Sequence, residues 1–282
     1  MKLCRYGKAG YEKPGLIDQE GRVRDLSKVV DNIGPNEISP RGLKMLTKIK
    51  PDSLAMVNGN PRLGVPYVGI GKFIAIGLNY SDHAKEAGLA LPSEPIVFLK
   101  ATTCINGPND DVIQPKNSTK LDWEVELGVV IGSQAKYVAE ADALNCVAGY
   151  CIVNDVSERS FQMATSQWDK GKGFDTAGPI GPWLVTQDEI RDPQVLDMRL
   201  DVNGKRMQSG NTRTMVFGVA KIISHVSHYM TLMPGDIIAT GTPPGVGLGI
   251  KPTPVFLKPG DVMTLGIDGL GAQRQKVAAF SS

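Results

Sequence analysis

The sequence predicts a β-rich α+β domain with few helices. Its apolar residues mostly form short runs or alternate with polar residues, which are the patterns of buried and half-buried strands. Residues 81–88 and 212–227 are the clearest helix candidates. Ser81 or Asp82 can cap the first and Gly88 can end it, and the apolar residues of the second share one face of a helix. Turn motifs separate the runs, among them a Pro-Gly-Asp sequence that starts at Pro234 and again at Pro259.

The composition is that of a soluble globular protein. Of the 282 residues, 41% are hydrophobic and 21% are charged, which suits one large domain or one domain with a small appendage. The 31 Lys and Arg residues against 29 Asp and Glu residues leave a net charge of +2, without a patch of like charge. We therefore expect no nucleic acid and no membrane surface as a partner.

The sequence also favours a cytoplasmic location. Its first residues lack the apolar core of a signal peptide, and no apolar run approaches the roughly 20 residues of a membrane span. Its cysteines include no Cys-x-x-Cys pair and predict reduced thiols. With three histidines and no His or Cys cluster, a structural zinc site is not expected.

Residues 1–65 are expected to form a small N-terminal domain, and residues 66–282 the catalytic domain. Residues 13–27 read as two short strands around a Gln-Glu-Gly turn. Residues 52–66 are rich in Pro, Gly and Asn, which is typical of a connection. No chemistry is evident in this first part.

Glu124 and Glu126 lie in a strand-like stretch, residues 121–132, where they alternate with Val125 and Leu127. Residues two apart in a strand point to the same face, so the two carboxylates should lie side by side. Such a pair is unfavourable unless a proton, a cationic side chain or a metal ion compensates it, and oxygen ligands suit Mg²⁺ or Mn²⁺. An exposed edge strand with two solvated glutamates is the alternative.

His83 and Glu86 lie three residues apart on the helix predicted for residues 81–88, so they share a face. A carboxylate beside an imidazole orients it and raises its basicity, as a general base acting on water requires. An ordinary surface pair explains the same spacing.

Acidic and amide side chains follow the buried strand predicted for residues 149–155. Asp155 ends that strand, either as a site residue or as the cap of the next helix. Arg159 and Gln162 lie three apart in the segment that follows.

Two later residues are further candidates. Lys172, between two glycines, is either a ligand-binding lysine or a solvated loop residue. Thr242 offers a hydroxyl and a backbone N–H at the mouth of a later strand.

Taken together, these segments resemble the fumarylacetoacetate hydrolase family, in its short bacterial form. The resemblance covers residues 70 to about 275 and rests on six motifs: GLNYSDHAKE (77–86), DWEVELGVVIG (122–132), NDVSERSFQ (154–162), KGFDTAGPIGP (172–182), VNGKRMQ (202–208) and PGDIIATGTPPGVG (234–247). It implies the family's mixed β-roll and a homodimer.

The resemblance also implies roles for individual residues. The metal ion, Mg²⁺ or Mn²⁺, would be bound by Glu124, Glu126 and Asp155. The catalytic residues would be the water-activating pair His83 and Glu86, together with Lys172. The substrate-binding residues would be Tyr80, Arg159, Gln162 and Thr242. Longer relatives add an aspartate ligand upstream of the histidine, and Leu78-Asn79 offers none here.

The activity we expect is metal-dependent hydrolysis of the C–C bond of a 2,4-dioxo acid, an acylpyruvate or a 2,4-diketo-3-deoxy sugar acid, to pyruvate and a carboxylic acid. The same family includes ureidoglycolate lyases and enzymes that decarboxylate oxaloacetate or isomerise oxo-dienoates. The water-activating pair favours the hydrolase. A non-catalytic metal- or ligand-binding protein would lack that pair. The walls of the substrate pocket should come from loops near residues 89–95 and 244–252.

Overall fold

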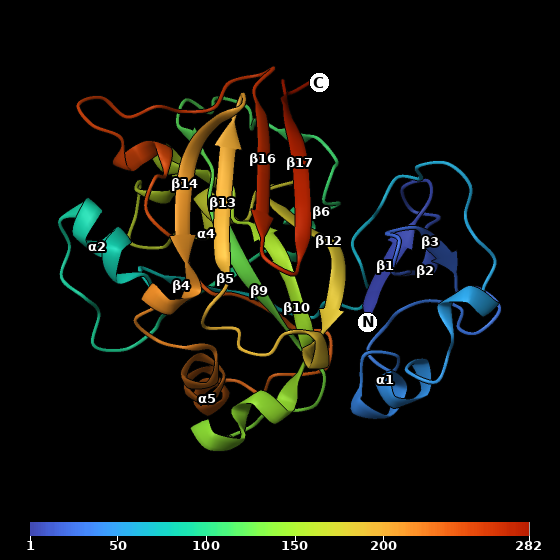
Figure 1. The fold of residues 1–282 in the computed structure, drawn as a ribbon. Helices are drawn as coiled ribbons and strands as arrows, with labels where there is room; N and C mark the ends of the chain where they lie inside the picture. The colour runs from blue at the N-terminus through green and yellow to red at the C-terminus, as the bar shows by residue number, and fades with distance from the viewer. Residues whose placement is uncertain (282) are drawn as a thin grey trace.

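The framework of the protein is a pair of sheets, seen in a computed structural model that describes residues 1–281 (Figure 1). The larger sheet has ten strands: β1 Lys2–Tyr6, β2 Lys13–Ile17, β3 Val23–Asp25, β4 Phe73–Gly77, β5 Ile96–Lys100, β6 Ile105–Asn106, β9 Val125–Ile131, β10 Val147–Asn154, β12 Gly178–Thr186 and β15 Ile237–Ala239. Their order is β3-β2-β1-β12-β10-β9-β15-β4-β5, with β6 paired to β12.

The smaller sheet lies in front of the larger one in Figure 1. Its order is β14-β13-β16-β17-β7, formed by β7 Val112–Ile113, β13 Asp197–Val202, β14 Lys205–Asn211, β16 Val262–Ile267 and β17 Gly271–Ala278. A separate short pair consists of β8 Leu121–Asp122 and β11 Ser157–Glu158. The predicted β-rich α+β class is confirmed.

The helices are short and lie around the sheets: α1 Pro40–Leu46, α2 Ser81–Ala87, α3 Arg159–Gln162, α4 Asp169–Lys172 and α5 Val219–Tyr229. Helix α2 ends as predicted at Gly88, whose φ of 67° is left-handed and favours glycine. Helix α5 begins later than residue 212, because Thr212–Thr214 form a 3₁₀ turn and Gly218 precedes the helix. Further 3₁₀ turns are Pro51–Ser53, Thr102–Cys104, Glu140–Cys146, Gln187–Glu189 and Gly247–Gly249. Among residues 1–281, no helix combines the length and the apolar character required to cross a membrane.

Strands β9 and β10 form the centre of the larger sheet, and both are buried along their whole length. They are antiparallel, and their register pairs Asn154 at the end of β10 with Val125 at the start of β9. This register brings Asp155 next to Glu124, whose carbonyl oxygen accepts a hydrogen bond from the Asp155 N–H at 2.9 Å. The centre of the sheet therefore places acidic residues from two strands at one edge of the core.

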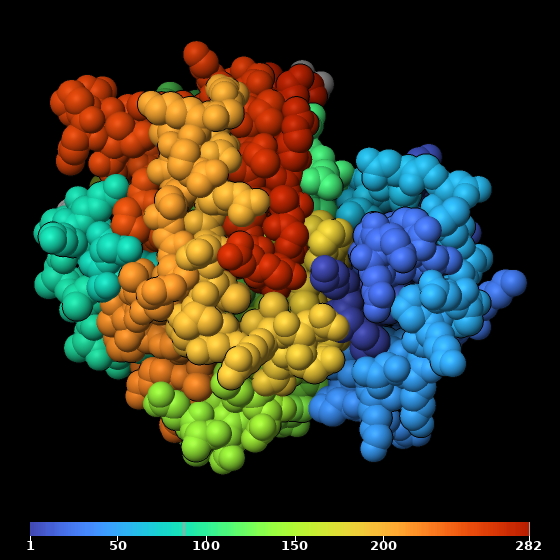
Figure 2. All heavy atoms as spheres, in the orientation of Figure 1, coloured from blue at the N-terminus to red at the C-terminus, as the bar shows by residue number. Residues whose placement is uncertain are grey.

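The first strands of the chain extend the larger sheet. Strand β1 pairs with β12 through Lys2 and Val185, and β2 and β3 follow it as the predicted hairpin. Figure 2 shows this part (blue) as a lobe beside the rest of the molecule. The domain boundary at residue 65 stays a prediction.

Candidate metal-binding and catalytic site

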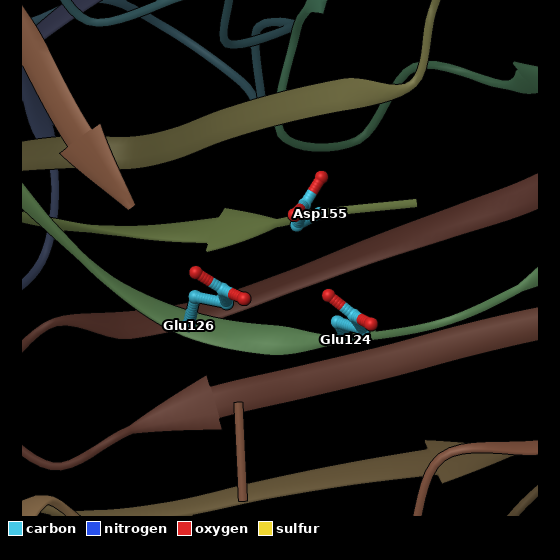
Figure 3. A group of neighbouring side chains, drawn as sticks. All are labelled: Glu124, Glu126 and Asp155. Carbon is cyan, nitrogen blue, oxygen red and sulfur yellow. The ribbon is translucent and has the colours of Figure 1, made fainter. Parts of the chain in front are cut away.

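Three buried carboxylates converge where β9 begins and β10 ends (Figure 3). Glu124, Glu126 and Asp155 each offer one oxygen, and these oxygens all lie within 4.8 Å of one another. The three residues are at most 6% exposed. Glu124 lies in the break between β8 and β9, so the strand expected over residues 121–132 is interrupted, yet Glu124 and Glu126 converge with Asp155 in the predicted cluster. The cluster is buried, so the alternative of an exposed edge strand is wrong.

Cationic side chains surround this carboxylate cluster. The Lys172 Nζ atom lies 2.6 Å from Glu124 Oε2 and 2.7 Å from Asp155 Oδ2. The Lys100 Nζ atom lies 2.5 Å from the other oxygen of Asp155, Oδ1. The Arg159 Nη2 atom lies 2.7 Å from Glu124 Oε1. Such pairing is needed because an isolated buried charge is strongly unfavourable.

The three carboxylates do not share this compensation equally. Burial by itself would raise the pKa of Glu124, but the charges of Lys172 and Arg159 outweigh burial and lower it to about 2. For Glu126, burial raises the pKa well above its usual value, and the nearby charges of Asp155 and Glu124 raise it further. The surrounding cations therefore do not fully compensate the negative charge that Glu126 carries when it is ionised. Three carboxylate oxygens that still require positive charge fit a hard divalent cation such as Mg²⁺ or Mn²⁺.

Lys172 is buried rather than solvated. It is 3% exposed and ends helix α4, whereas the sequence suggested a glycine-rich loop. The preceding residue, Gly171, allows this: a Cβ atom there would lie 2.4 Å from the backbone nitrogen of Gln162. Glycine thus permits α4 to pack closely against α3 and to direct Lys172 to the carboxylates.

Arg159 and Gln162 occupy the two ends of α3 and contact each other. Arg159 Nη1 donates to Gln162 Oε1 at 3.0 Å, and Arg159 Nε donates to Asp122 Oδ2 at 2.8 Å. Asp122 is fully buried and also accepts hydrogen bonds from the backbone N–H groups of Gly247 (2.6 Å) and Leu248 (3.0 Å). Asp122 therefore links the arginine of the site to the loop at residues 244–252.

His83 and Glu86 form the predicted pair. His83 Nδ1 lies 3.2 Å from Glu86 Oε2, and Glu86 Oε1 and Oε2 accept from the Gly245 N–H at 3.1 and 3.2 Å. Burial opposes ionisation of Glu86, but the hydrogen bonds that Glu86 makes with His83 and with the Gly245 N–H favour it, and the pKa of Glu86 is lowered. The ionised carboxylate holds Nδ1 of the imidazole, which directs Nε2 to other partners.

These side chains line one cavity of about 70 Å³. Its walls are His83, Glu124, Glu126, Asp155, Arg159, Gln162, Lys172 and Thr242, together with Ile76, Gly77, Leu78, Phe98 and Trp168. Segments far apart in the chain thus bring an acidic cluster, two cations and an imidazole to a common space.

Thr242 and Tyr80 differ in their relation to this cavity. Thr242 lines it, and its hydroxyl donates to the Val125 carbonyl at 2.9 Å. Tyr80 is fully buried, and its hydroxyl donates to the sulfur of Met198 at 3.1 Å. Tyr80 is not among the residues that line the cavity, so the predicted contact between Tyr80 and the substrate is not supported by its position.

Two charged residues of the site were not foreseen from the sequence, Lys100 and Asp122. Lys100 ends β5, where a lone cation follows four apolar residues. A charged residue at the end of a buried strand is the signal that singled out Asp155, and it applies equally to Lys100. Asp122 lies two residues before Glu124, so the alternation that singled out Glu124 and Glu126 extends to it as well.

Comparison with known proteins identifies the family. The family model described as "Fumarylacetoacetate (FAA) hydrolase C-terminal" matches residues 72–278. The chain belongs to the fumarylacetoacetate hydrolase family. This membership confirms the resemblance recognised in the motifs, and it assigns the carboxylate cluster and the cavity to the part of the chain that the family shares.

Several members of the fumarylacetoacetate hydrolase family are similar over their full length. A protein of Burkholderia ambifaria, provisionally named a hydrolase, is 61% identical over 276 residues, 98% of each chain. The solved fumarylacetoacetate hydrolase of Exiguobacterium antarcticum is 37% identical, with a TM-score of 0.90 over 99% of this chain and 100% of that one. Maleylpyruvate hydrolase of Sphingobium, solved with manganese(II) and pyruvate, is 29% identical, with a TM-score of 0.82 over 100% of both chains. These similarities confirm the expected fold.

Proposed function

We propose that this protein is a divalent-metal-dependent hydrolase that cleaves the C3–C4 bond of a 2,4-dioxo acid to give pyruvate and a carboxylic acid. The observation that carries the proposal is that the carboxylate cluster and His83 line the same cavity. The relative solved with manganese and pyruvate supports both the type of ion and the class of product.

Glu124, Glu126 and Asp155 would hold the metal ion, Mg²⁺ or Mn²⁺. The bound ion would supply positive charge that polarises the oxo-acid end of the substrate. Arg159 and Lys172 lie against the same carboxylates, so they add positive charge on the side where the anionic end of the substrate would be held. Because Gln162 Oε1 accepts from Arg159, its amide nitrogen is directed to donate to a substrate oxygen.

In the reaction, Nε2 of His83 takes a proton from water, and the hydroxide adds to the C4 carbonyl carbon. The C3–C4 bond then breaks, and its electron pair stays on the pyruvate fragment as an enolate, which takes a proton at C3. The acyl fragment leaves as a carboxylic acid, so one water molecule is consumed. Glu86 stabilises the imidazolium that forms, and Lys172 places an ammonium group near the enolate.

The His83–Glu86 pair is what favours hydrolysis over related reactions. A ureidoglycolate lyase or an oxaloacetate decarboxylase eliminates or decarboxylates without adding water, so neither needs a base that activates water. A non-catalytic binding protein needs no such base either. The pair is assembled here by two hydrogen bonds to Glu86, which is consistent with a working base.

The experiment that tests this proposal is a substrate panel of acylpyruvates, a 2,4-diketo-3-deoxy sugar acid, oxaloacetate and ureidoglycolate. Each is assayed with Mg²⁺, with Mn²⁺ and with a chelator, and pyruvate, CO₂, urea and glyoxylate are measured. We expect pyruvate from a diketo acid, with loss of activity in chelator. Urea and glyoxylate from ureidoglycolate, with no pyruvate from any diketo acid, would overturn the proposal.

We further propose that the protein acts as a homodimer in the cytoplasm. The proposal of a cytoplasmic location is supported by its four cysteines, all buried and free. Light scattering on the purified protein tests the dimer.

A further inference from the structure

A second, larger cavity of about 540 Å³ adjoins the inner cavity of the site. The two have five lining residues in common: Leu78, His83, Arg159, Gln162 and Trp168. The remaining walls of this outer chamber are Glu86, Leu89, Met163, Val246, Leu248, Gly249, Lys251 and Pro254. Residues 89 and 246–251 fall in the two loops that the sequence predicted as pocket walls.

The walls of the outer chamber are mostly apolar. Leu89, Met163 and Leu248 come from three separate segments and are 51%, 70% and 37% exposed, yet all three face the same hollow. Single exposed apolar residues are common, but a concave group of them beside a polar site marks a binding surface. Among the described residues that line only the outer chamber, Lys251 is the one cation.

The apolar wall is fixed in place relative to the inner site. Asp122 accepts hydrogen bonds from Gly247 and Leu248 and also holds Arg159. Glu86 accepts from Gly245 in the same loop and also holds His83. The loop is therefore linked through Asp122 to Arg159 and through Glu86 to His83. The chamber thus has a defined position next to the reacting atoms.

His83 lines both cavities, so the bond that is broken should lie between them. In the proposed reaction, the oxo-acid end lies in the inner cavity, against the carboxylate cluster and Lys172. The carbonyl carbon attacked by water lies at His83. The substituent on that carbon must then extend into the outer chamber.

We infer that this substituent is an apolar alkyl or aryl group, and that Leu248 is a specificity-determining residue that contacts it. The inference rests on the proposed function and decides between its two substrate classes: an acylpyruvate with an apolar tail, and not a diketo-deoxy sugar acid. The hydroxyls of a sugar acid would lose water against Leu89, Met163 and Leu248 without gaining partners there. An apolar tail gains from the same contact.

The test compares kcat/KM for acetopyruvate, hexanoylpyruvate, an acylpyruvate whose tail ends in a carboxylate, and a 2,4-diketo-3-deoxy sugar acid. We expect kcat/KM to rise with tail length by about two- to fourfold per buried methylene, and hexanoylpyruvate to be the best substrate. Leu248→Ser should reduce the ratio of hexanoylpyruvate to acetopyruvate activity by about tenfold. Leu99→Ser, at a residue that is 44% exposed and lines neither cavity, should leave this ratio unchanged.

The possible failures are distinguishable. If acetopyruvate is cleaved but longer tails bring no gain, or if the sugar acid or the carboxylate-ended tail is preferred, the apolar chamber is overturned and the proposed function stands. An unchanged ratio in Leu248→Ser would remove that residue from specificity. If no diketo acid is cleaved, the proposed function and this inference fall together.

Discussion

The ammonium nitrogen of Lys100 lies 2.5 Å from Oδ1 of Asp155, and both side chains are almost completely buried. Lys172 binds the other oxygen of the same carboxylate, so Asp155 is held by a lysine on each side. Lys100 also donates to the Ala177 carbonyl at 3.2 Å, which anchors it to the backbone. The orientation of Asp155 therefore depends on a residue outside the cavity.

Replacing Lys100 should destabilise the fold. Lys100→Met keeps most of the apolar volume but leaves one oxygen of Asp155 without its ion pair. Breaking one partner of a buried pair costs about 3–5 kcal/mol, and we expect about 3 kcal/mol here because Lys172 remains. Urea unfolding in the presence of chelator measures the change. Lys116→Met, at an exposed lysine, should change the stability by less than about 0.5 kcal/mol. Equal stabilities for the two variants would show that the pair has no net effect.

The carboxylate cluster should be required for metal binding. Glu124→Gln and Asp155→Asn each remove one anionic oxygen donor, so we expect Mn²⁺ binding to fall below detection in calorimetric titration. Glu140→Gln, at an exposed glutamate that is not part of the cluster, provides the matched control and should bind like the wild type. Wild-type affinity in both cluster variants would place the ion elsewhere.

The imidazole should matter for turnover and not for metal binding. His83→Ala removes the proposed general base, and general-base assistance typically contributes about 10²–10⁴-fold. We expect a loss of that size in kcat, with unchanged affinity for Mn²⁺ in the same preparation. His225→Ala, on helix α5 outside both cavities, should retain wild-type kcat. Full hydrolysis by His83→Ala would exclude the pair from the mechanism.

The interactions of Glu86 should make stability depend on pH. Because the pKa of Glu86 is lowered from 4.5 in the folded protein, its ionised form contributes stability above pH 4.5. That contribution is lost as the pH falls through the lower folded-state pKa. The free energy of unfolding of Glu86→Gln should therefore be about 1 kcal/mol lower than that of the wild type at pH 7, and this difference should shrink below pH 4.5. Urea titrations of both proteins across this range measure it, and a difference that grows towards acid would contradict the assignment.

The sequence predicted the elements of the site well where the pattern is local. Alternation over residues 121–132 predicts that Glu124 and Glu126 share a face, and their carboxylates do converge although the strand is interrupted at Trp123 and Glu124. A polar residue after an apolar run marks Asp155. The spacing of three between His83 and Glu86 is likewise a property of a single helix. The resemblance to the family then assigned roles, and the structure brings all of the named residues except Tyr80 around one cavity or directly behind it.

What lies outside a local pattern was not predicted. The Lys100–Asp155 pair joins residues 55 positions apart, and the Arg159–Asp122 pair joins residues 37 positions apart. The burial of Lys172 depends on Gly171 packing against α3, and no feature near residue 172 signals it.

Local patterns in the sequence thus predicted the candidate side chains of the site and most of the elements that carry them, because strand and helix periodicity act over a few residues. The packing of distant segments was needed to show which cations compensate the carboxylate cluster, that Tyr80 is not among the residues that line the cavity, and that an apolar chamber adjoins His83. The ion pairs of the carboxylate cluster and the outer chamber both form where separate segments of the chain meet. The free energy of a buried charge depends on every group around it, whatever the position of that group in the chain.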